Sequence, residues 1–193
     1  MTLTFKVLTW DEIISMSIKL GNIVKKSGFN PNYLIGVARG GLVPLRIMSD
    51  FFNNNNVFIV NVKLYEDIAR KAENVRFLQG IDEDISGHNV LVIDDVADTG
   101  VTLKAVVDYI KNNLKPKELK VATLHYKPWS VIKPDYYLSE VRDWIVYPWE
   151  YVETINSLAK KLESGEFSGE EKVNAERALK EIQEQLNKYD GVI

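Results

Sequence analysis

Three carboxylates lie within five residues just after an apolar run in the middle of the chain. The run spans residues 90–93, and the acidic residues that follow it are Asp94, Asp95 and Asp98. Carboxylate oxygens at the end of a buried strand can bind the hydroxyl groups of a sugar or a hard cation. A solvated acidic turn is the simpler interpretation, but so much negative charge directly after a buried strand favours a binding site.

A turn suited to a phosphate group begins directly after the third carboxylate. It opens a predicted helix and consists of Thr99, Gly100, Val101 and Thr102. Unpaired backbone N–H groups and the positive end of a helix dipole attract a phosphate, and threonine hydroxyls add further donors. No Gly-Lys-Thr or Gly-Lys-Ser sequence occurs, which argues against a Walker-type nucleotide site. The two segments together predict a cradle for a ribose phosphate.

A second candidate anion-binding loop lies earlier in the chain. It follows another apolar run and consists of Ala38, Arg39, Gly40 and Gly41. Glycines allow backbone N–H groups to approach an anion closely, and an arginine adds a positive charge with two parallel donors. Taken alone, this loop could equally be an ordinary turn from a strand into a helix.

The composition limits the classes of protein and of site. The 193 residues are 46% hydrophobic and 26% charged, which is typical of a globular protein. There is no cysteine and there are two histidines, which excludes disulfides, thiolate nucleophiles and multi-histidine metal sites. A net charge of −3 provides no field for nucleic acid, and no apolar segment is long enough to span a membrane. We therefore expect a cytoplasmic protein without nucleic acid or membrane partners.

Short apolar runs alternate with helical patterns over most of the chain. The expected strands, rich in Val and Ile, span residues 33–37, 57–62, 90–94 and 119–124. The expected helices between them span residues 42–52 and 101–114. This alternation predicts an α/β fold with a central, mainly parallel sheet flanked by helices. Ligands bind such sheets at the carboxyl ends of the strands, which here means the loops at Ala38, Asp94 and Lys127.

Helical patterns are expected at both ends of the chain. Thr9 and Glu12 form a potential capping box before the first helix, and Ser168 and Glu171 form another before the last. After Pro148 two amphipathic stripes predict a pair of helices. We expect two parts, a main domain of residues 1–150 and a C-terminal helical hairpin of residues 151–193.

The connector of residues 65–87 is long for a loop between two elements. Residues 75–78 are apolar enough to add a short strand pair within it. A long loop beside a site is often a lid, and an ordinary exposed excursion is the equal alternative.

The order and spacing of these segments resemble the type I phosphoribosyltransferases, in particular their hypoxanthine-guanine and xanthine-guanine members. Residues 94–100, DDVADTG, are similar to that family's signature for 5-phosphoribosyl-1-pyrophosphate (PRPP). The similarity extends from Tyr33 to Glu150. It implies the type I phosphoribosyltransferase fold, here with a C-terminal helical extension in place of the short tail expected of a xanthine-guanine enzyme.

The resemblance implies three groups of binding residues. The PRPP site comprises Asp94, Asp95, Ala97, Asp98, Thr99, Gly100, Val101 and Thr102. The pyrophosphate site, with a cis peptide between its first two residues, comprises Ala38, Arg39, Gly40, Lys63 and Tyr65. The base site comprises Val96, Lys127, Trp144 and Ile145.

It also implies roles for individual side chains. Trp144 stacks on the base, the backbone of Ile145 recognises its exocyclic group, and Lys127 recognises the 6-oxo group. Arg39 stabilises the departing pyrophosphate, and Asp98 acts as general base. The implied cofactor, Mg²⁺, is held largely through water by the carboxylates of Asp94 and Asp95.

The expected activity is the transfer of 5-phosphoribosyl from PRPP to a 6-oxopurine (hypoxanthine, guanine or xanthine). The products are the nucleoside 5′-monophosphate and pyrophosphate, as in purine salvage, and the resemblance implies a homodimer. Two alternatives remain at this point: an adenine phosphoribosyltransferase on the same frame, or a regulator that senses PRPP. The net negative charge of the chain argues against a regulator that binds nucleic acid.

Overall fold

The chain folds into two compact units, each described here by itself. A computed structural model describes residues 2–67 and 72–189, and the side chains of 64–67 and 72–74 are outside that description. One unit spans Ile14–Val141, and the other combines Met1–Ile13 with Arg142–Ile193. The units do not coincide with the predicted boundary after Glu150, because a strand near the N-terminus pairs with one that precedes this boundary.

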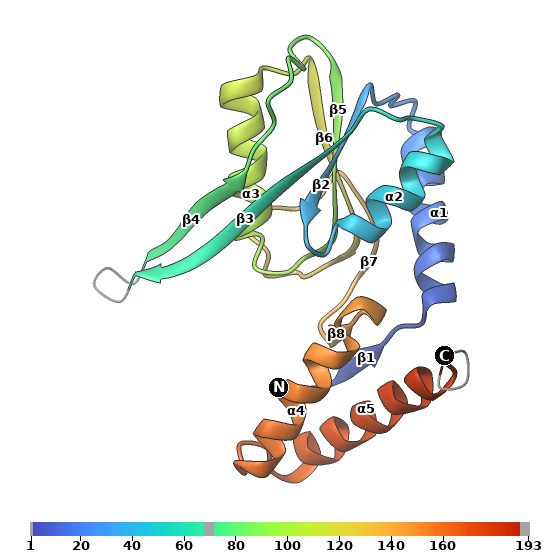
Figure 1. The fold of residues 1–193 in the computed structure, drawn as a ribbon, viewed down its shortest axis with the longest axis vertical. Helices are drawn as coiled ribbons and strands as arrows, with labels where there is room; N and C mark the ends of the chain where they lie inside the picture. Colours follow the sequence, from blue (N-terminus) through green and yellow to red (C-terminus); the bar gives the residue numbers. More distant parts are fainter. Residues whose placement is uncertain (1, 68–71, 190–193) are drawn as a thin grey trace. The chain divides into compact units, whose positions relative to one another are not determined.

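The larger unit is built on a six-stranded sheet with the order β4-β3-β2-β5-β6-β7 (Figure 1). Its strands are β2 (Tyr33–Ala38), β3 (Val57–Asp67), β4 (Ala72–Gln79), β5 (Asn89–Ala97), β6 (Glu118–Tyr126) and β7 (Tyr136–Glu140). All neighbours pair in parallel except β3 and β4, which form an antiparallel hairpin. The predicted α/β class and mainly parallel sheet are confirmed.

Helices cover both faces of this sheet. They are α1 (Trp10–Lys26), α2 (Leu42–Phe52) and α3 (Val101–Tyr109), the last continued by the π-helical turn η1 (Ile110–Leu114). Helix α3 covers one face, where Val92 and Val106 belong to the same buried core (Figure 1). Helix α2 covers the other face, so closely that a Cβ atom at Gly36 would lie 2.6 Å from the side chain of Leu45. The predicted helices 42–52 and 101–114 are confirmed, although the second ends in a π turn.

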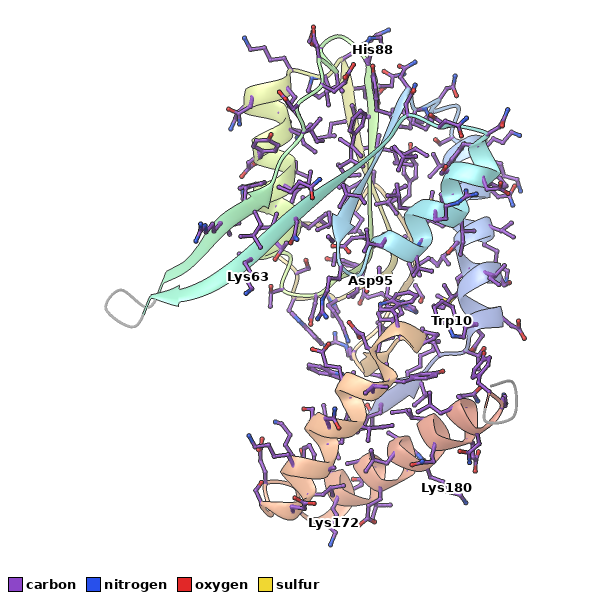
Figure 2. The ribbon with its side chains drawn as sticks, viewed as in Figure 1. Trp10, Lys63, His88, Asp95, Lys172 and Lys180 are labelled. Atoms are coloured by element: carbon purple, nitrogen blue, oxygen red, sulfur yellow. The ribbon has the colours of Figure 1, made fainter. Side chains whose placement is uncertain are left out.

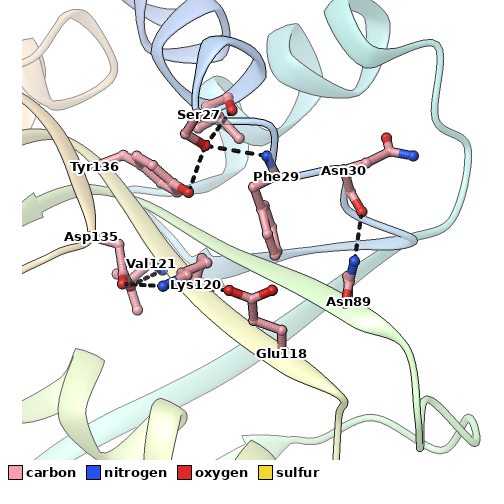
Figure 3. Close-up of polar contacts among 10 residues, drawn as sticks. Ser27, Phe29, Asn30, Asn89, Glu118, Lys120, Val121, Asp135 and Tyr136 are labelled. Carbon is pink, nitrogen blue, oxygen red and sulfur yellow. Dashed lines mark hydrogen bonds and ion pairs between the residues drawn. The ribbon is translucent and has the colours of Figure 1, made fainter.

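Polar contacts fasten β6 to the turn that leads into β7 (Figure 3). The carboxylate of Asp135 accepts bonds from the Val121 N–H at 2.8 Å and from the Lys120 ammonium at 3.2 Å. This hydrogen bond to Asp135 raises the pKa of Lys120. The hydroxyl groups of Ser27 and Tyr136 lie 2.8 Å apart and connect the turn after α1 with β7.

The smaller unit holds the C-terminal helices. Its elements are β1 (Phe5–Val7), β8 (Trp144–Val146), the 3₁₀ turn η2 (Pro148–Glu150), α4 (Tyr151–Glu163) and α5 (Gly169–Asn187). Strands β1 and β8 pair in parallel, and the buried Val146 packs with Tyr151 of α4 and Ile182 of α5. The sequence predicted both helices but neither strand, because three residues are too few to show an alternating pattern.

One of the two predicted capping boxes is confirmed. The backbone N–H of Thr9 donates to the Glu12 carboxylate at 2.8 Å, and the Glu12 N–H donates to the Thr9 hydroxyl at 3.3 Å. Helix α5 begins directly after Ser168, as predicted, but the Ser168 side chain makes no capping bond. None of the helices in the described ranges is both long and apolar enough to cross a membrane.

Candidate functional site

The candidate loops lie along one edge of the central sheet. Strands β2, β5 and β6 are neighbours and run in parallel, so their carboxyl ends share an edge. Gly36 pairs with Ile93, and the loop that follows Ala38 lies against the last part of β5, where a Cβ atom on Gly40 would touch the Asp95 carboxylate. Ala97 pairs with Tyr126, which brings the acidic turn next to Lys127. The predicted loops at Ala38, Asp94 and Lys127 therefore lie next to one another.

Two buried carboxylates lie in the last part of β5, which continues to Ala97. Asp94 is 9% exposed and Asp95 is 7% exposed. The backbone N–H of Asp95 donates to the Asp94 carboxylate at 3.0 Å, and that of Val96 donates to the Asp95 carboxylate at 2.6 Å.

Asp95 connects the two candidate anion-binding loops. A Cβ atom built on Gly40 would lie 2.2 Å from its Oδ2 atom, so the loop backbone approaches this carboxylate as only glycine allows. The next residue, Gly41, is equally confined, since its Cβ would lie 2.4 Å from the Ile93 carbonyl oxygen. The peptide bond between Ala38 and Arg39 is cis, as the resemblance implied. Figure 2 shows Asp95 at this edge of the sheet.

The predicted phosphate turn keeps its donors available. Gly100 precedes α3 with a φ of 79°, in the left-handed region that favours glycine. A Cβ atom there would also lie 2.2 Å from the Ser130 hydroxyl oxygen. Within the described chain, the backbone N–H groups of Gly100, Thr102 and Leu103 have no protein acceptor. Open donors at a helix N-terminus can bind a phosphate, so the turn has the geometry that its sequence predicted.

The loop after β6 is attached to this turn. The Lys127 N–H donates to the Ala97 carbonyl at 3.0 Å, and the Val131 N–H donates to the Thr99 carbonyl at 2.9 Å. Lys127 itself is 5% exposed. Between these attachments, the indole N–H of Trp129 donates to the exposed Asp98 carboxylate at 3.2 Å. The segment of residues 126–129, interpreted from sequence as part of the base site, includes Trp129, but nothing in the local pattern relates Trp129 to Asp98.

The β3–β4 hairpin brings two cations to the same edge. Strand β2 ends at Ala38, opposite Asn61, and β3 continues beyond it. Just after Asn61 the β3–β4 register shifts, and Lys63 then lies directly opposite Arg76. Both side chains are exposed, and within the described residues neither has a carboxylate partner. Like charges directly opposite one another are destabilising, so this pair is suited to an anionic ligand.

Two predictions about the hairpin have different outcomes. The strand expected at residues 75–78 is confirmed as part of β4, whereas the side chain of Tyr65 lies outside the described residues. The sequence analysis did not identify Arg76 as a candidate site residue, because only the strand register places it opposite Lys63. Figure 2 shows Lys63 on this hairpin.

The remaining base-site residues belong to both units. Val96 is half-buried in the larger unit, and Ile145 is 7% exposed in the smaller unit. Trp144, at the start of β8, is 54% exposed, and its backbone N–H donates to the Thr4 carbonyl at 2.8 Å. A cavity of about 220 Å³ beside it is lined by Phe5 and other residues of the same unit. A tryptophan that belonged to the hydrophobic core would be buried, whereas Trp144 is exposed.

Fold and site together define an α/β protein that presents buried carboxylates and an open helix N-terminus at the carboxyl edge of a parallel sheet. Residues 11–154 match the model of the family described as the phosphoribosyl transferase domain. The chain therefore belongs to this family.

Curated relatives and solved structures agree with this assignment. The chain is 31% identical over 146 residues to xanthine-guanine phosphoribosyltransferase from Desulfotalea psychrophila, covering 74% of this chain and 84% of that protein. It shares 34% sequence identity with purine phosphoribosyltransferase from Pyrococcus horikoshii. The crystal structure of that protein matches with a TM-score of 0.69 over 76% of this chain and 94% of that one. A Neisseria gonorrhoeae protein with bound ppGpp shares the fold at 24% identity, with a TM-score of 0.71 over 86% of this chain and 99% of that one.

Proposed function

We propose that this protein is a purine phosphoribosyltransferase that acts on 6-oxopurine bases. It transfers 5-phosphoribosyl from PRPP to hypoxanthine, guanine or xanthine and releases the nucleoside 5′-monophosphate and pyrophosphate. The observation that carries the proposal is the acidic strand end followed by an open helix N-terminus, with Lys127 attached beside it. The names of the xanthine-guanine and hypoxanthine-guanine relatives support the same substrate class.

Each part of the donor has a matching part of the site. The N–H groups of Gly100 and Thr102 would bind the 5′-phosphate, and the carboxylates of Asp94 and Asp95 would hold the ribose hydroxyls. Arg39 would take the pyrophosphate, together with the two cations of the β3–β4 hairpin. Binding at both ends places the anomeric carbon between them, which is the positioning that this kind of transfer needs.

The transfer itself needs charge stabilisation and one proton acceptor. The bond between the anomeric carbon and the pyrophosphate oxygen breaks as the bond to the purine nitrogen forms, so positive charge develops on the ribose. Arg39 and Lys63 would stabilise the negative charge on the departing pyrophosphate. Asp98, on the exposed turn, would accept the proton that the imidazole ring of the base loses.

Mg²⁺ fits the chemistry of the donors at this site. The buried groups at the strand end are carboxylates, and the chain has no cysteine, so a hard cation with oxygen ligands is preferred. The described residues include no group of three or more metal-binding side chains, so Asp94 and Asp95 would hold the ion largely through water. When bound, the ion would neutralise charge on the pyrophosphate.

The cellular setting and the oligomeric state are proposed from the resemblance to this family and from the composition. We expect the protein to work in the cytoplasm as a homodimer, with PRPP and a purine base as its ligands. The net charge of −3 offers no support for a nucleic-acid partner.

The proposal is tested by measuring pyrophosphate release with PRPP, Mg²⁺ and each purine base in turn. We expect turnover with at least one 6-oxopurine and little or none with adenine, and loss of turnover when EDTA removes the metal. Turnover with adenine alone would contradict the substrate class. Tight binding of PRPP without turnover of any base would indicate a PRPP-sensing regulator instead.

A further inference from the structure

Trp129 is held at a fixed place beside the acidic turn. The backbone bonds from Lys127 to Ala97 and from Val131 to Thr99 lie on either side of it in the sequence. Between them, the Ser130 N–H donates to the Lys127 carbonyl at 3.0 Å and closes a tight turn. The backbone around Trp129 is therefore attached at two points to the turn that contains Asp98.

One indole ring contacts both side chains to which the proposed reaction assigns base chemistry. Its N–H donates to Asp98 Oδ1 at 3.2 Å, and the ammonium nitrogen of Lys127 lies 5.4 Å from its ring centroid. Trp129 is 48% exposed, so filling the core does not account for a tryptophan at this position. A hydrogen-bond donor on one side and a cation on the ring face use two separate properties of the same side chain.

We propose that Trp129 is a positioning residue for ribosyl transfer, which aligns Asp98 through its N–H and Lys127 through its ring face. This inference rests on the proposed function. A carboxylate on an exposed turn rotates freely unless one oxygen is held, and the indole bond to Oδ1 leaves Oδ2 to face the purine nitrogen. A general base that is already held in its reactive orientation lowers the barrier, because the carboxylate does not have to reorient during the reaction.

The ring face has a separate effect on base recognition. An ammonium group over an aromatic face is attracted by the ring's negative potential, which limits the directions in which a long lysine side chain extends. Lys127 is thereby directed at one position of the bound base, where the 6-oxo group would lie. Trp129 thus contributes to turnover through its N–H and to the choice of base through its ring.

Two substitutions separate these effects. Trp129→Phe keeps an aromatic ring and removes the N–H, so we expect kcat to fall about 5- to 10-fold, the size of one lost hydrogen bond, with the KM of the base nearly unchanged. Trp129→Ala removes both, so kcat should fall similarly and the KM for 6-oxopurines should rise about 3- to 10-fold more. Equal kinetics for wild type and Trp129→Phe, at equal Tm, would overturn the proposal.

A double-mutant cycle distinguishes positioning from a general structural role. If Trp129 acts through Asp98, then Trp129→Phe should cause no further loss of kcat in an Asp98→Asn background. If the two losses multiply instead, Trp129 does not act through Asp98 and the proposal fails. A wild-type protein that turns over no purine would refute the proposed function itself, an outcome distinct from an active wild type with an unaltered Trp129→Phe variant.

Discussion

At the scale of single residues, Asp98 is the side chain on which the proposed proton transfer depends. Asp98→Asn keeps the size and the acceptor oxygen for Trp129 but cannot take a proton, so we expect kcat to fall about 10²- to 10⁴-fold. The KM for PRPP should stay nearly unchanged. Asp108→Asn, on the exposed side of α3 where Asp108 pairs with Lys104, is the matched control and should leave activity intact. Near-normal turnover of Asp98→Asn would remove Asp98 from the role of general base.

Lys127 provides the corresponding prediction for the base. Its side chain is buried, with the ammonium nitrogen 5.4 Å from the Trp129 ring centroid, and a hydrogen bond from a charged donor contributes about 1.5–3 kcal/mol. Lys127→Ala should therefore lower kcat/KM for 6-oxopurines about 10- to 100-fold. Any turnover of adenine, which has no 6-oxo group, should be largely unaffected. Equal losses for both kinds of base would assign Lys127 to folding rather than to recognition.

Some of these residues could be predicted from the sequence, whereas others could not because their contacts join separate segments of the chain. Asp94, Asp98 and Gly100 belong to one continuous segment, whose residue types and order already describe a binding turn. Arg76 lies opposite Lys63, and Trp129 bonds to Asp98, only because strand pairing and loop attachment bring separate segments together. The assigned roles themselves remain predictions that kinetics must test.

At the scale of elements, the β3–β4 hairpin should contribute to PRPP binding. Lys63→Met and Arg76→Gln each remove one of two opposed cations, so we expect the KM for PRPP to rise about 3- to 10-fold in each, as for a weakened charged hydrogen bond. Removing one cation also relieves repulsion, so neither variant should be less stable than wild type. Lys172→Met on α5 is a matched surface control. An unchanged KM for PRPP in both variants would exclude the hairpin from the donor site.

Helix α4 is joined to the N-terminal segment by a buried hydrogen bond from the Tyr151 hydroxyl to the Leu8 carbonyl. Burial, together with Tyr189 and Glu12, raises the pKa of Tyr151 to about 12. Since the unfolded pKa is about 10, this group stabilises the fold fully below pH 10, and its contribution is lost as pH rises towards 12. Tyr151→Phe should cost about 1–3 kcal/mol at neutral pH and flatten the alkaline loss of stability. Urea unfolding at several pH values measures both effects.

The elements that the sequence revealed are those with a long pattern. Helix α2 and the central strands carry enough apolar residues to show their period, and their positions match the predictions closely. Strands β1 and β8 have three residues each and exist because they pair with each other. Pairing between distant segments leaves no local pattern, which is also why the predicted boundary after Glu150 differs from the division seen in the structure.

At the scale of the whole molecule, each of the two units has a hydrophobic cluster of its own and contains some of the residues predicted to bind a substrate. The core of the larger unit includes Val92 and Leu103, and that of the smaller unit includes Val146 and Ile182. The turn proposed for PRPP lies wholly in the larger unit, whereas Trp144 belongs to the smaller unit. Damage confined to one core should therefore affect one substrate more than the other.

Ile182→Ala tests this separation. Ile182 is fully buried, so truncation should lower the free energy of unfolding of its unit by about 2–5 kcal/mol. Because Val146 packs on Ile182 and directly follows Trp144 and Ile145, the KM for the purine base should rise while that for PRPP stays the same. Val173→Ala, on the exposed side of the same helix, should change neither value. A rise in the KM for PRPP alone would show that α5 supports the donor site and not the base site.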